Sequence, residues 1–129
     1  MTRINMYDKP IPKGAYVKLT VSAGIGADEE FNVEIIPDKG FKLDLSYIII
    51  DMTNAPELEA NLIAVTEKGE SPLLANNVTQ ADGEVVIDRT DFGGALFDKV
   101  VLYAKTTTAT TQDNEIVVYY GGRQVTPWM

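Results

Sequence analysis

The sequence predicts an all-β protein, specifically a single-domain antiparallel β-sandwich, with jelly-roll topology as one option. The first observation is periodicity: along the 129 residues, about seven to nine short segments alternate apolar and polar side chains, at a spacing of roughly 10 residues. Clusters of Gly, Pro, Asn and Asp separate these segments, as turns do. Hardly any amphipathic helix is visible, which favours an all-β class. An immunoglobulin-like sandwich is the other topology considered, but its Cys–Trp–Cys signature is missing.

Three strands are expected in the first half of the chain. Residues 15–22 (AYVKLTVS) and 31–36 (FNVEII) alternate cleanly, and PDKG at 37–40 is a turn signal. Residues 41–52 (FKLDLSYIIIDM) carry the longest period-two pattern in the chain. The side chains expected to share the core face are Ala15, Val17, Leu19, Val21, Phe31, Val33, Ile35, Phe41, Leu43, Leu45, Tyr47 and Ile49.

The second half is expected to open with a short helical turn at 53–62, with Asn54 as its cap and Pro56 in its first turn. Further strand or loop segments follow. They are a strand at 61–69, a short strand or loop at 71–78, a strand at 83–90, a loop with a Gly-Gly pair at 91–97, and strands at 99–106 and 115–120 on either side of a polar, Thr-rich stretch.

One core is feasible at this length without disulfides, since apolar residues make up 45% of the chain. Residues 1–14 (MTRINMYDKPIPKG) contain two prolines and show no periodicity. The sequence therefore predicts an extended N-terminal arm at 1–14 and a β-sandwich domain at 15–129.

The composition removes several kinds of chemistry. The chain has no Cys and no His, so Ser-His-Asp and Cys-His catalytic arrangements and the commonest zinc ligands are excluded. GIGADE at 24–29 begins like a dinucleotide-binding loop, but Glu29 stands where a third glycine is expected and a strand follows instead of a helix. We therefore expect no enzyme activity, no catalytic residues and no cofactor.

The acidic residues leave two alternatives open. Asp82, Glu84, Asp88 and Asp91 could supply oxygen ligands to calcium, although no calcium-loop pattern is present and no metal site is predicted. A carboxylate pair could also hydrolyse a glycoside, but no motif singles one out.

The charge balance argues against nucleic acid as a partner, because 19 acidic residues stand against 11 basic ones, a formal net charge of −8. No signal-peptide pattern and no apolar run long enough to cross a bilayer is visible. We therefore expect a soluble protein without membrane contact.

Three features go beyond what the sandwich needs. They are the basic arm, the Thr-rich stretch, which could continue a hairpin beyond the body of the domain, and the apolar end VTPWM. Each could instead be an ordinary loop or terminus. The residues predicted to bind a partner are Arg3, Lys9, Lys13, Thr106, Thr108, Thr110, Tyr120 and Trp128.

A compact body without Cys or His, the arm MTRINMYDKPIPKG and the ending VVYYGGRQVTPWM together resemble the auxiliary capsid, decoration or head–tail proteins of tailed bacteriophages. The resemblance implies a non-enzymatic structural protein of a viral particle. It implies contacts with a major capsid or other virion protein, a homo-oligomer, and location in the virion after assembly in the host cytoplasm.

The alternative function is a carbohydrate-binding β-sandwich module. Tyr119 and Tyr120 are adjacent in an expected strand, so one ring must face each way. The exposed ring, together with Trp128, could then stack on a sugar.

Overall fold

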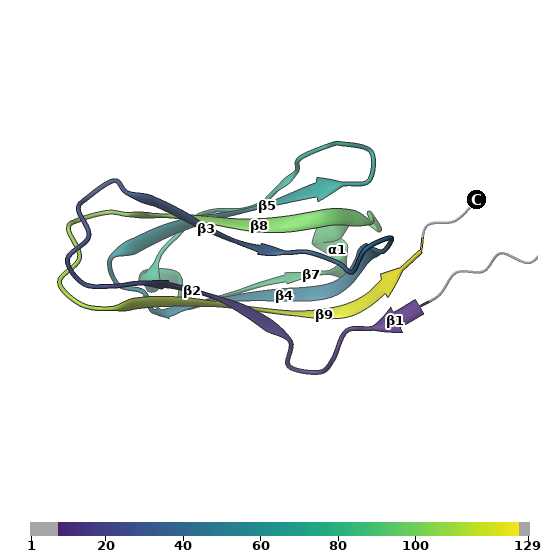
Figure 1. Cartoon of the computed structure of the whole chain (residues 1–129), viewed down its shortest axis with the longest axis horizontal. Coiled ribbons are helices and arrows are strands. Elements are labelled where there is room, and N and C mark those ends of the chain that lie inside the picture. The colour runs from purple at the N-terminus through teal and green to yellow at the C-terminus, as the bar shows by residue number, and fades with distance from the viewer. Residues whose placement is uncertain (1–7, 127–129) are drawn as a thin grey trace, which may run out of the picture.

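The computed structural model describes residues 8–126, which form two β-sheets packed face to face (Figure 1). The strands are β1 (Asp8–Pro10), β2 (Tyr16–Val21), β3 (Glu30–Ile35), β4 (Lys42–Asn54), β5 (Leu58–Thr66), β6 (Leu73–Val78), β7 (Glu84–Asp88), β8 (Phe97–Thr106) and β9 (Asn114–Val125). Two one-turn helices, η1 (Gln80–Asp82) and α1 (Arg89–Phe92), lie between the later strands.

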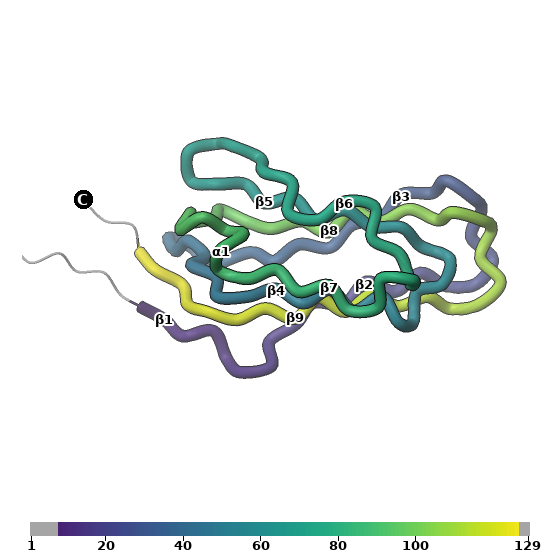
Figure 2. Tube along the Cα trace, turned by 180° about the vertical axis from the view of Figure 1, so that it is seen from behind, coloured from purple at the N-terminus to yellow at the C-terminus, as the bar shows by residue number. Residues whose placement is uncertain are grey.

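The strand order is that of a jelly roll. Sheet I has the order β2–β9–β4–β7, and β1 pairs with the C-terminal part of β9. Sheet II has the order β3–β8–β5–β6. All pairs are antiparallel, and the Leu43–Phe97 pair joins the sheets. Figure 2 shows β6 and β7 from behind. Because the chain passes repeatedly between the sheets, as in two Greek keys, the predicted all-β sandwich and its jelly-roll option are confirmed.

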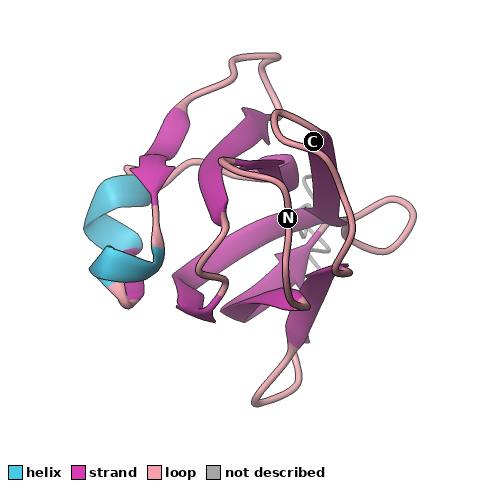
Figure 3. Cartoon of the chain, turned by 90° about the vertical axis from the view of Figure 1, so that its left-hand side faces the viewer, coloured by secondary structure: helices cyan, strands magenta, loops and turns pink. Residues whose placement is uncertain are grey.

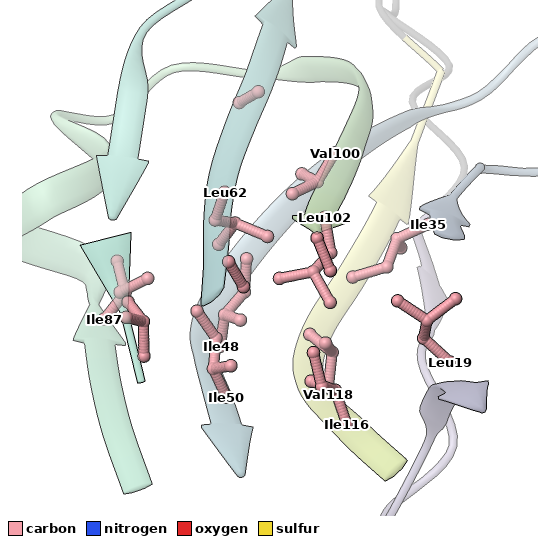
Figure 4. Close-up of a cluster of buried hydrophobic side chains, with 14 of the residues drawn as sticks. Leu19, Ile35, Ile48, Ile50, Leu62, Ile87, Val100, Leu102, Ile116 and Val118 are labelled. Atoms are coloured by element: carbon pink, nitrogen blue, oxygen red, sulfur yellow. The ribbon is translucent and has the colours of Figure 1, made fainter. Parts of the chain in front are cut away.

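The core fills the space between the sheets (Figure 4). Leu19, Ile48, Ile116 and Val118 enter it from sheet I, and Ile35, Leu62, Val100 and Leu102 from sheet II. Burying one such side chain stabilises the fold by roughly 1.5–3 kcal/mol relative to leaving it exposed. The inward faces predicted for 15–22 and 31–36 are confirmed by this packing.

A β-bulge in β4 corrects the single face predicted for 41–52. Leu43 and Leu45 point into the core, but the pairing with β9 shifts between Leu45 and Tyr47. After this shift Ile48, Ile50 and Met52 are the buried residues, so Tyr47 and Ile49 lie on the outer face. One extra residue reverses the alternation of everything that follows it.

The helical turn predicted at 53–62 is also wrong. β4 runs to Asn54, a turn follows, and β5 begins at Leu58. Leu58, Ala60, Leu62 and Ala64 are buried at period two. This burial outweighs the capping signal of Asn54 and Pro56, because tertiary packing commonly overrides local propensity.

Two boundaries differ from the sequence expectation in the later part of the chain. The strand predicted at 83–90 ends at Asp88, and α1 follows and reaches into the loop predicted at 91–97. Asp88 caps α1 by accepting hydrogen bonds from the Thr90 and Asp91 amides. The last strand does not stop before Gly121 but continues to Val125. Its second half pairs with β1 and with the start of β4.

Residues 8–11 lie against the domain, and residues 12–14 form an exposed loop. β1 pairs with β9, the Ile11 amide donates a hydrogen bond to the Gly122 carbonyl at 3.1 Å, and the Ile11 side chain is buried. This part of the predicted arm therefore belongs to the edge of sheet I, while residues 1–7 lie outside the described residues. The boundary placed at residue 14 stays a prediction.

Candidate functional site

The outer face of sheet I carries an apolar row across four strands. Tyr16 of β2, Tyr119 of β9, Ile49 of β4 and Val86 of β7 are direct register partners, and we call these four residues the tyrosine row. Tyr16 is 54% exposed and Val86 62% exposed. The rings of Tyr16 and Tyr119 lie 6.1 Å apart with an interplanar angle of 55°. Exposed apolar side chains in a line, rather than scattered, are typical of an interaction surface.

The β4 bulge creates this row. It turns Ile49 outward, and it brings the Tyr47 ring over Gly121, where a Cβ would lie 2.2 Å from the Tyr47 Cε1 atom. The neighbouring Gly122 has φ +134°, and a Cβ there would lie 2.3 Å from the Asp44 carbonyl oxygen. The Gly121-Gly122 pair is therefore required by the close approach of β4 and β9.

Charged groups border the row. The Lys18 ammonium lies 3.2 Å from the Glu115 carboxylate, and its hydrogen bond to Glu115 raises the pKa of Lys18. At the other end of the sheet, the Arg123 guanidinium contacts Asp44 at 2.8 Å and Asp8 at 2.6 Å. The hydrogen bond to Asp44 raises the pKa of Arg123. These pairs leave the row as an apolar strip between polar margins.

The outer face of sheet II is different, because it is polar and hollowed. A hollow of about 190 Å³, which we call the Tyr103 hollow, is lined by Glu30, Glu59, Asn61, Asn77, Tyr103, Ala104 and Lys105. Tyr103 lies between Asn32 and Asn61 in register and is 45% exposed. Lys105 lies between Glu30 and Glu59.

The Thr-rich stretch is tied into the domain and does not extend as a hairpin. β8 ends at Thr106 and β9 begins at Asn114, and the residues between them run beside the β2–β3 loop at one end of the sandwich (Figure 1). Figure 3 looks onto this end. The predicted continuation of the hairpin beyond the body is therefore wrong.

Two threonines of this stretch are buried. The Thr106 hydroxyl donates to the Gly26 carbonyl at 2.7 Å and accepts from the Glu29 amide at 2.9 Å. The Thr110 hydroxyl donates to the Ser22 carbonyl at 2.8 Å and accepts from the Ile25 amide at 2.8 Å. Because both hydroxyls are hydrogen-bonded within the domain, Thr106 and Thr110 stabilise the fold. We therefore no longer propose them as contact residues for a partner. Thr108 is exposed.

Glu57, in the turn between β4 and β5, holds the other side of this stretch. Its carboxylate accepts hydrogen bonds from the Asn114 side-chain amide at 2.9 Å and from the Thr111 amide at 3.0 Å. These bonds, that from Asn114 first, lower the pKa of Glu57. The backbone of Glu57 is fixed as well, because its amide donates to the Asn114 side-chain oxygen at 2.9 Å.

The other predicted partner residues are not brought together into one site. Lys9 is exposed, forms an ion pair with Asp38, and lies 5.4 Å from the centre of the Phe41 ring. The hydrogen bond from Lys9 lowers the pKa of Asp38. Lys13 is exposed in the β1–β2 loop. Arg3 and Trp128 lie outside the described residues.

The two adjacent tyrosines divide as their alternation requires. Tyr119 faces outward in the tyrosine row, while the half-buried Tyr120 packs against the core. Burial, followed by the nearby Asp38, raises the pKa of Tyr120. A sugar or a partner subunit on the outer face of sheet I would meet Tyr119 rather than Tyr120.

Three of the four acidic residues considered for calcium serve as caps, and the fourth, Glu84, is exposed at the start of β7. Asp82 accepts from the Thr79 amide at 2.8 Å, and Asp88 and Asp91 form the capping box of α1. No group of three or more acidic side chains among residues 8–126 is arranged to hold a metal ion. Within the same range, no helix has the length and apolar character that crossing a membrane demands.

Comparison with known proteins gives the fold. No family model matches the sequence, and the search of curated proteins found no match. The chain is similar in structure to the Yersinia pseudotuberculosis-derived mitogen, with a TM-score of 0.53 and 10% identity over 84% of this chain and 86% of that one. It is also similar to a protein of an archaeal virus turret with a triple jelly-roll fold, with a TM-score of 0.53 and 12% identity over 95% of this chain and 31% of that one. At such identities the likeness establishes the fold alone.

A pectin-binding carbohydrate-binding module is also matched. Its TM-score is 0.45 and its identity 14%, over 79% of this chain and 70% of that one. This likeness is too weak to support an argument about ligands.

Neither the tyrosine row nor the Tyr103 hollow was predicted from the sequence. The alternation predicted for 15–22 places Tyr16 opposite Leu19 and Val21, but the tyrosine row also depends on the bulge in β4. The Tyr103 hollow is lined by strands far apart in the sequence, so no local sequence pattern predicts it.

Proposed function

We propose that this chain is a non-enzymatic structural protein of a viral particle, which binds a neighbouring protein subunit through the tyrosine row. The observation that carries the proposal is the apolar line of Tyr16, Tyr119, Ile49 and Val86 across all four strands of sheet I, exposed at both ends. Burying such side chains against a partner is favourable because apolar surface leaves water.

The composition of the row favours a protein partner. The centres of protein interfaces are rich in tyrosine and poor in charge, and their margins are polar. The tyrosine row has this arrangement, with Lys18 and Glu115 at its border. With neighbouring strands about 4.8 Å apart, the row spans roughly 14 Å, which suits the anchor of a larger contact.

The edge of sheet I extends this surface. Within residues 8–126, β1 and β2 each pair only with β9, so their outer edges are open to an added strand. The exposed Lys13 lies in the loop between them. Lys9 and Lys13 are kept in the proposal as contacts around this edge, and Thr108 as a contact at the end of the sandwich. Arg3 and Trp128, which lie outside the described residues, are kept without a position.

Assignment to a viral particle rests on two supports. The sequence resembles the auxiliary proteins of tailed bacteriophages, and the jelly roll is also the fold of the archaeal virus turret protein. The partner would be a major capsid protein or another virion protein, including further copies of this chain. The protein would then be located in the virion, after assembly in the host cytoplasm.

The test uses particles purified from a culture of the virus that encodes the chain, carrying wild-type protein, Tyr16→Glu or the matched control Tyr103→Glu. Quantitative mass spectrometry would count copies of the chain per particle. We expect Tyr16→Glu to lower incorporation at least about tenfold, since a buried interface charge costs more than about 1.4 kcal/mol. Tyr103→Glu, on the opposite face, should be incorporated like wild type. A lysine-reactive cross-linker should join Lys13 to another subunit.

Circular dichroism of the purified variants would establish that both fold. The proposal is overturned if wild-type particles lack the chain. It is overturned equally if Tyr16→Glu is incorporated as well as wild type, or if both folded variants lose incorporation to the same extent.

A further inference from the structure

We propose that the Tyr103 hollow on the outer face of sheet II binds a neutral saccharide. This inference goes beyond the docking role of sheet I and uses the opposite face of the sandwich, so either can fail without the other. The hollow measures about 190 Å³ and combines one exposed aromatic ring with amide, carboxylate and ammonium groups.

The hollow has an identifiable structural origin. The β5–β6 pairing shifts register on both sides of Leu62, so β6 does not continue the flat surface of β3, β8 and β5. Asn77 of β6 adopts φ +52°, and its backbone amide donates a hydrogen bond to the Asn61 side-chain oxygen at 2.7 Å. The hollow is thus bordered by Asn77 of β6 and lined otherwise by residues of β3, β5 and β8.

Tyr103 supplies a stacking surface. A pyranose ring presents an apolar C–H face, and an exposed aromatic ring can cover that face while its hydroxyl stays in water. Tyr103 is 45% exposed and lies on the central strand β8, with Asn32 and Asn61 as its register neighbours. A ring on a central strand is held more rigidly than one on a loop, which favours a preformed site.

The amides supply directed hydrogen bonds. Because the Asn61 side-chain oxygen accepts a hydrogen bond from the Asn77 backbone amide, the orientation of the Asn61 side chain is set. Its NH₂ group keeps two donors for hydroxyl groups of a ligand. The Asn77 side chain lines the same hollow, and an amide offers both donors and an acceptor. Sugar hydroxyls, which both donate and accept, match this set.

The charges select against anionic sugars. Lys105 lies between Glu30 and Glu59 in register, so two carboxylates accompany one ammonium group. No hydrogen bond or ion pair within the described part of the chain occupies these three side chains, which leaves them available to hydroxyl groups. A uronate or sialate carboxylate would meet a net negative site on a chain of formal charge −8.

The test is a titration of the full chain, labelled with ¹⁵N, with three neutral oligosaccharides and two anionic ones. Cellotetraose, mannotriose and N-acetyllactosamine would be compared with tetragalacturonate and sialyllactose, each to about 5 mM, because one small stacking site gives millimolar to micromolar affinity. We expect at least one neutral probe to shift the side-chain amide signals of Asn61 and Asn77 in a saturable way. The anionic probes should bind at least about tenfold more weakly.

Two substitutions locate the binding. Tyr103→Ala should weaken it at least about tenfold, as removal of an aromatic anchor does. The matched control Tyr16→Ala, an exposed tyrosine on sheet I, should leave it unchanged. The backbone amide spectrum reports whether each variant is folded.

The saccharide site is overturned if none of the neutral probes shifts these signals. It is also overturned if an anionic probe binds more tightly than every neutral one. Binding that survives Tyr103→Ala but is lost in Tyr16→Ala would place the sugar on sheet I and equally reject the Tyr103 hollow.

Discussion

The outer faces of the two sheets differ although both arise from the same alternation of apolar and polar residues. Sheet I turns a line of tyrosine and aliphatic side chains outward, whereas sheet II turns out amides and charges around one tyrosine. The inner faces are alike, since both are lined by leucine, isoleucine and valine. Any functional difference between the two sheets must therefore come from their outer faces.

The difference originates in where each sheet is irregular. In sheet I the irregularity is central, because β4 bulges against β9 at the Gly121-Gly122 pair and exchanges the two faces of β4. In sheet II the pairing of β5 with the edge strand β6 is irregular and opens a hollow, while the shift between β5 and β8 is confined to Val65 and Thr66 at the end of β5. A central bulge changes which residues are exposed, and an edge bulge changes the shape of the surface.

The largest effect on stability is expected from a substitution at the central bulge. Gly122→Ala places a Cβ 2.3 Å from the Asp44 carbonyl oxygen at φ +134°. Because backbone cannot move aside cheaply, we expect the free energy of unfolding to fall by about 3 kcal/mol or more. Denaturant unfolding followed by circular dichroism would measure it.

The matched control for this change is Gly26→Ala, where a Cβ meets nothing within 4 Å. It should change stability by no more than about 0.5 kcal/mol. Equal stability of both variants would show that the bulge does not depend on Gly122, and that the contrast between the two sheets has another origin.

A smaller effect is expected at the end of the sandwich where the β2–β3 loop connects the sheets. Thr106→Val keeps the shape of the side chain but removes the hydroxyl that bridges the Gly26 carbonyl and the Glu29 amide. Leaving these groups without a partner should cost about 1–3 kcal/mol of unfolding free energy. Thr108→Val, at an exposed position of the same stretch, should cost less than about 0.5 kcal/mol. Thermal melts of the two variants would contradict the buried role of Thr106 if they coincided.

The smallest effect on stability is expected from protonation of Glu57 at acid pH. Glu57 lies in the turn that joins β4 of sheet I to β5 of sheet II. Hydrogen bonds from Asn114 and then Thr111 lower the folded-state pKa of Glu57 below its ordinary value of 4.5. A depressed folded pKa means that the stabilisation is complete above the unfolded-state pKa and is lost as pH falls through the folded value. Wild type should therefore exceed Glu57→Gln in melting temperature at about pH 7, with the gap closing by about pH 3.

The control for the pH series is Glu84→Gln, at an exposed position in β7. Its melting temperature should follow wild type throughout. A gap between wild type and Glu57→Gln that stays constant from neutral to acid pH would contradict the role of the Glu57 carboxylate.

Period-two patterns predicted most strands, because burial of one sheet face imposes them directly on the sequence. They failed where another constraint acted. At 53–62 the cap signal of Asn54 predicted a helical turn, but the buried positions Leu58 and Ala60 required a strand. The Thr-rich stretch was predicted to extend outward because threonine favours strands, whereas Thr106 and Thr110 are held by carbonyl and amide groups about 80 residues away in the sequence.

By itself, the sequence determined the all-β class, most strand positions and the absence of His and Cys chemistry, since these follow from composition and from neighbours along the chain. The tertiary structure alone decided which tyrosines meet, that Tyr119 rather than Tyr120 faces outward, and that a hollow forms around Tyr103. The physical reason is register: a single extra residue at Ser46 exchanges the two faces of β4, and only the fit of β4 against Gly121 and Gly122 fixes where that residue lies.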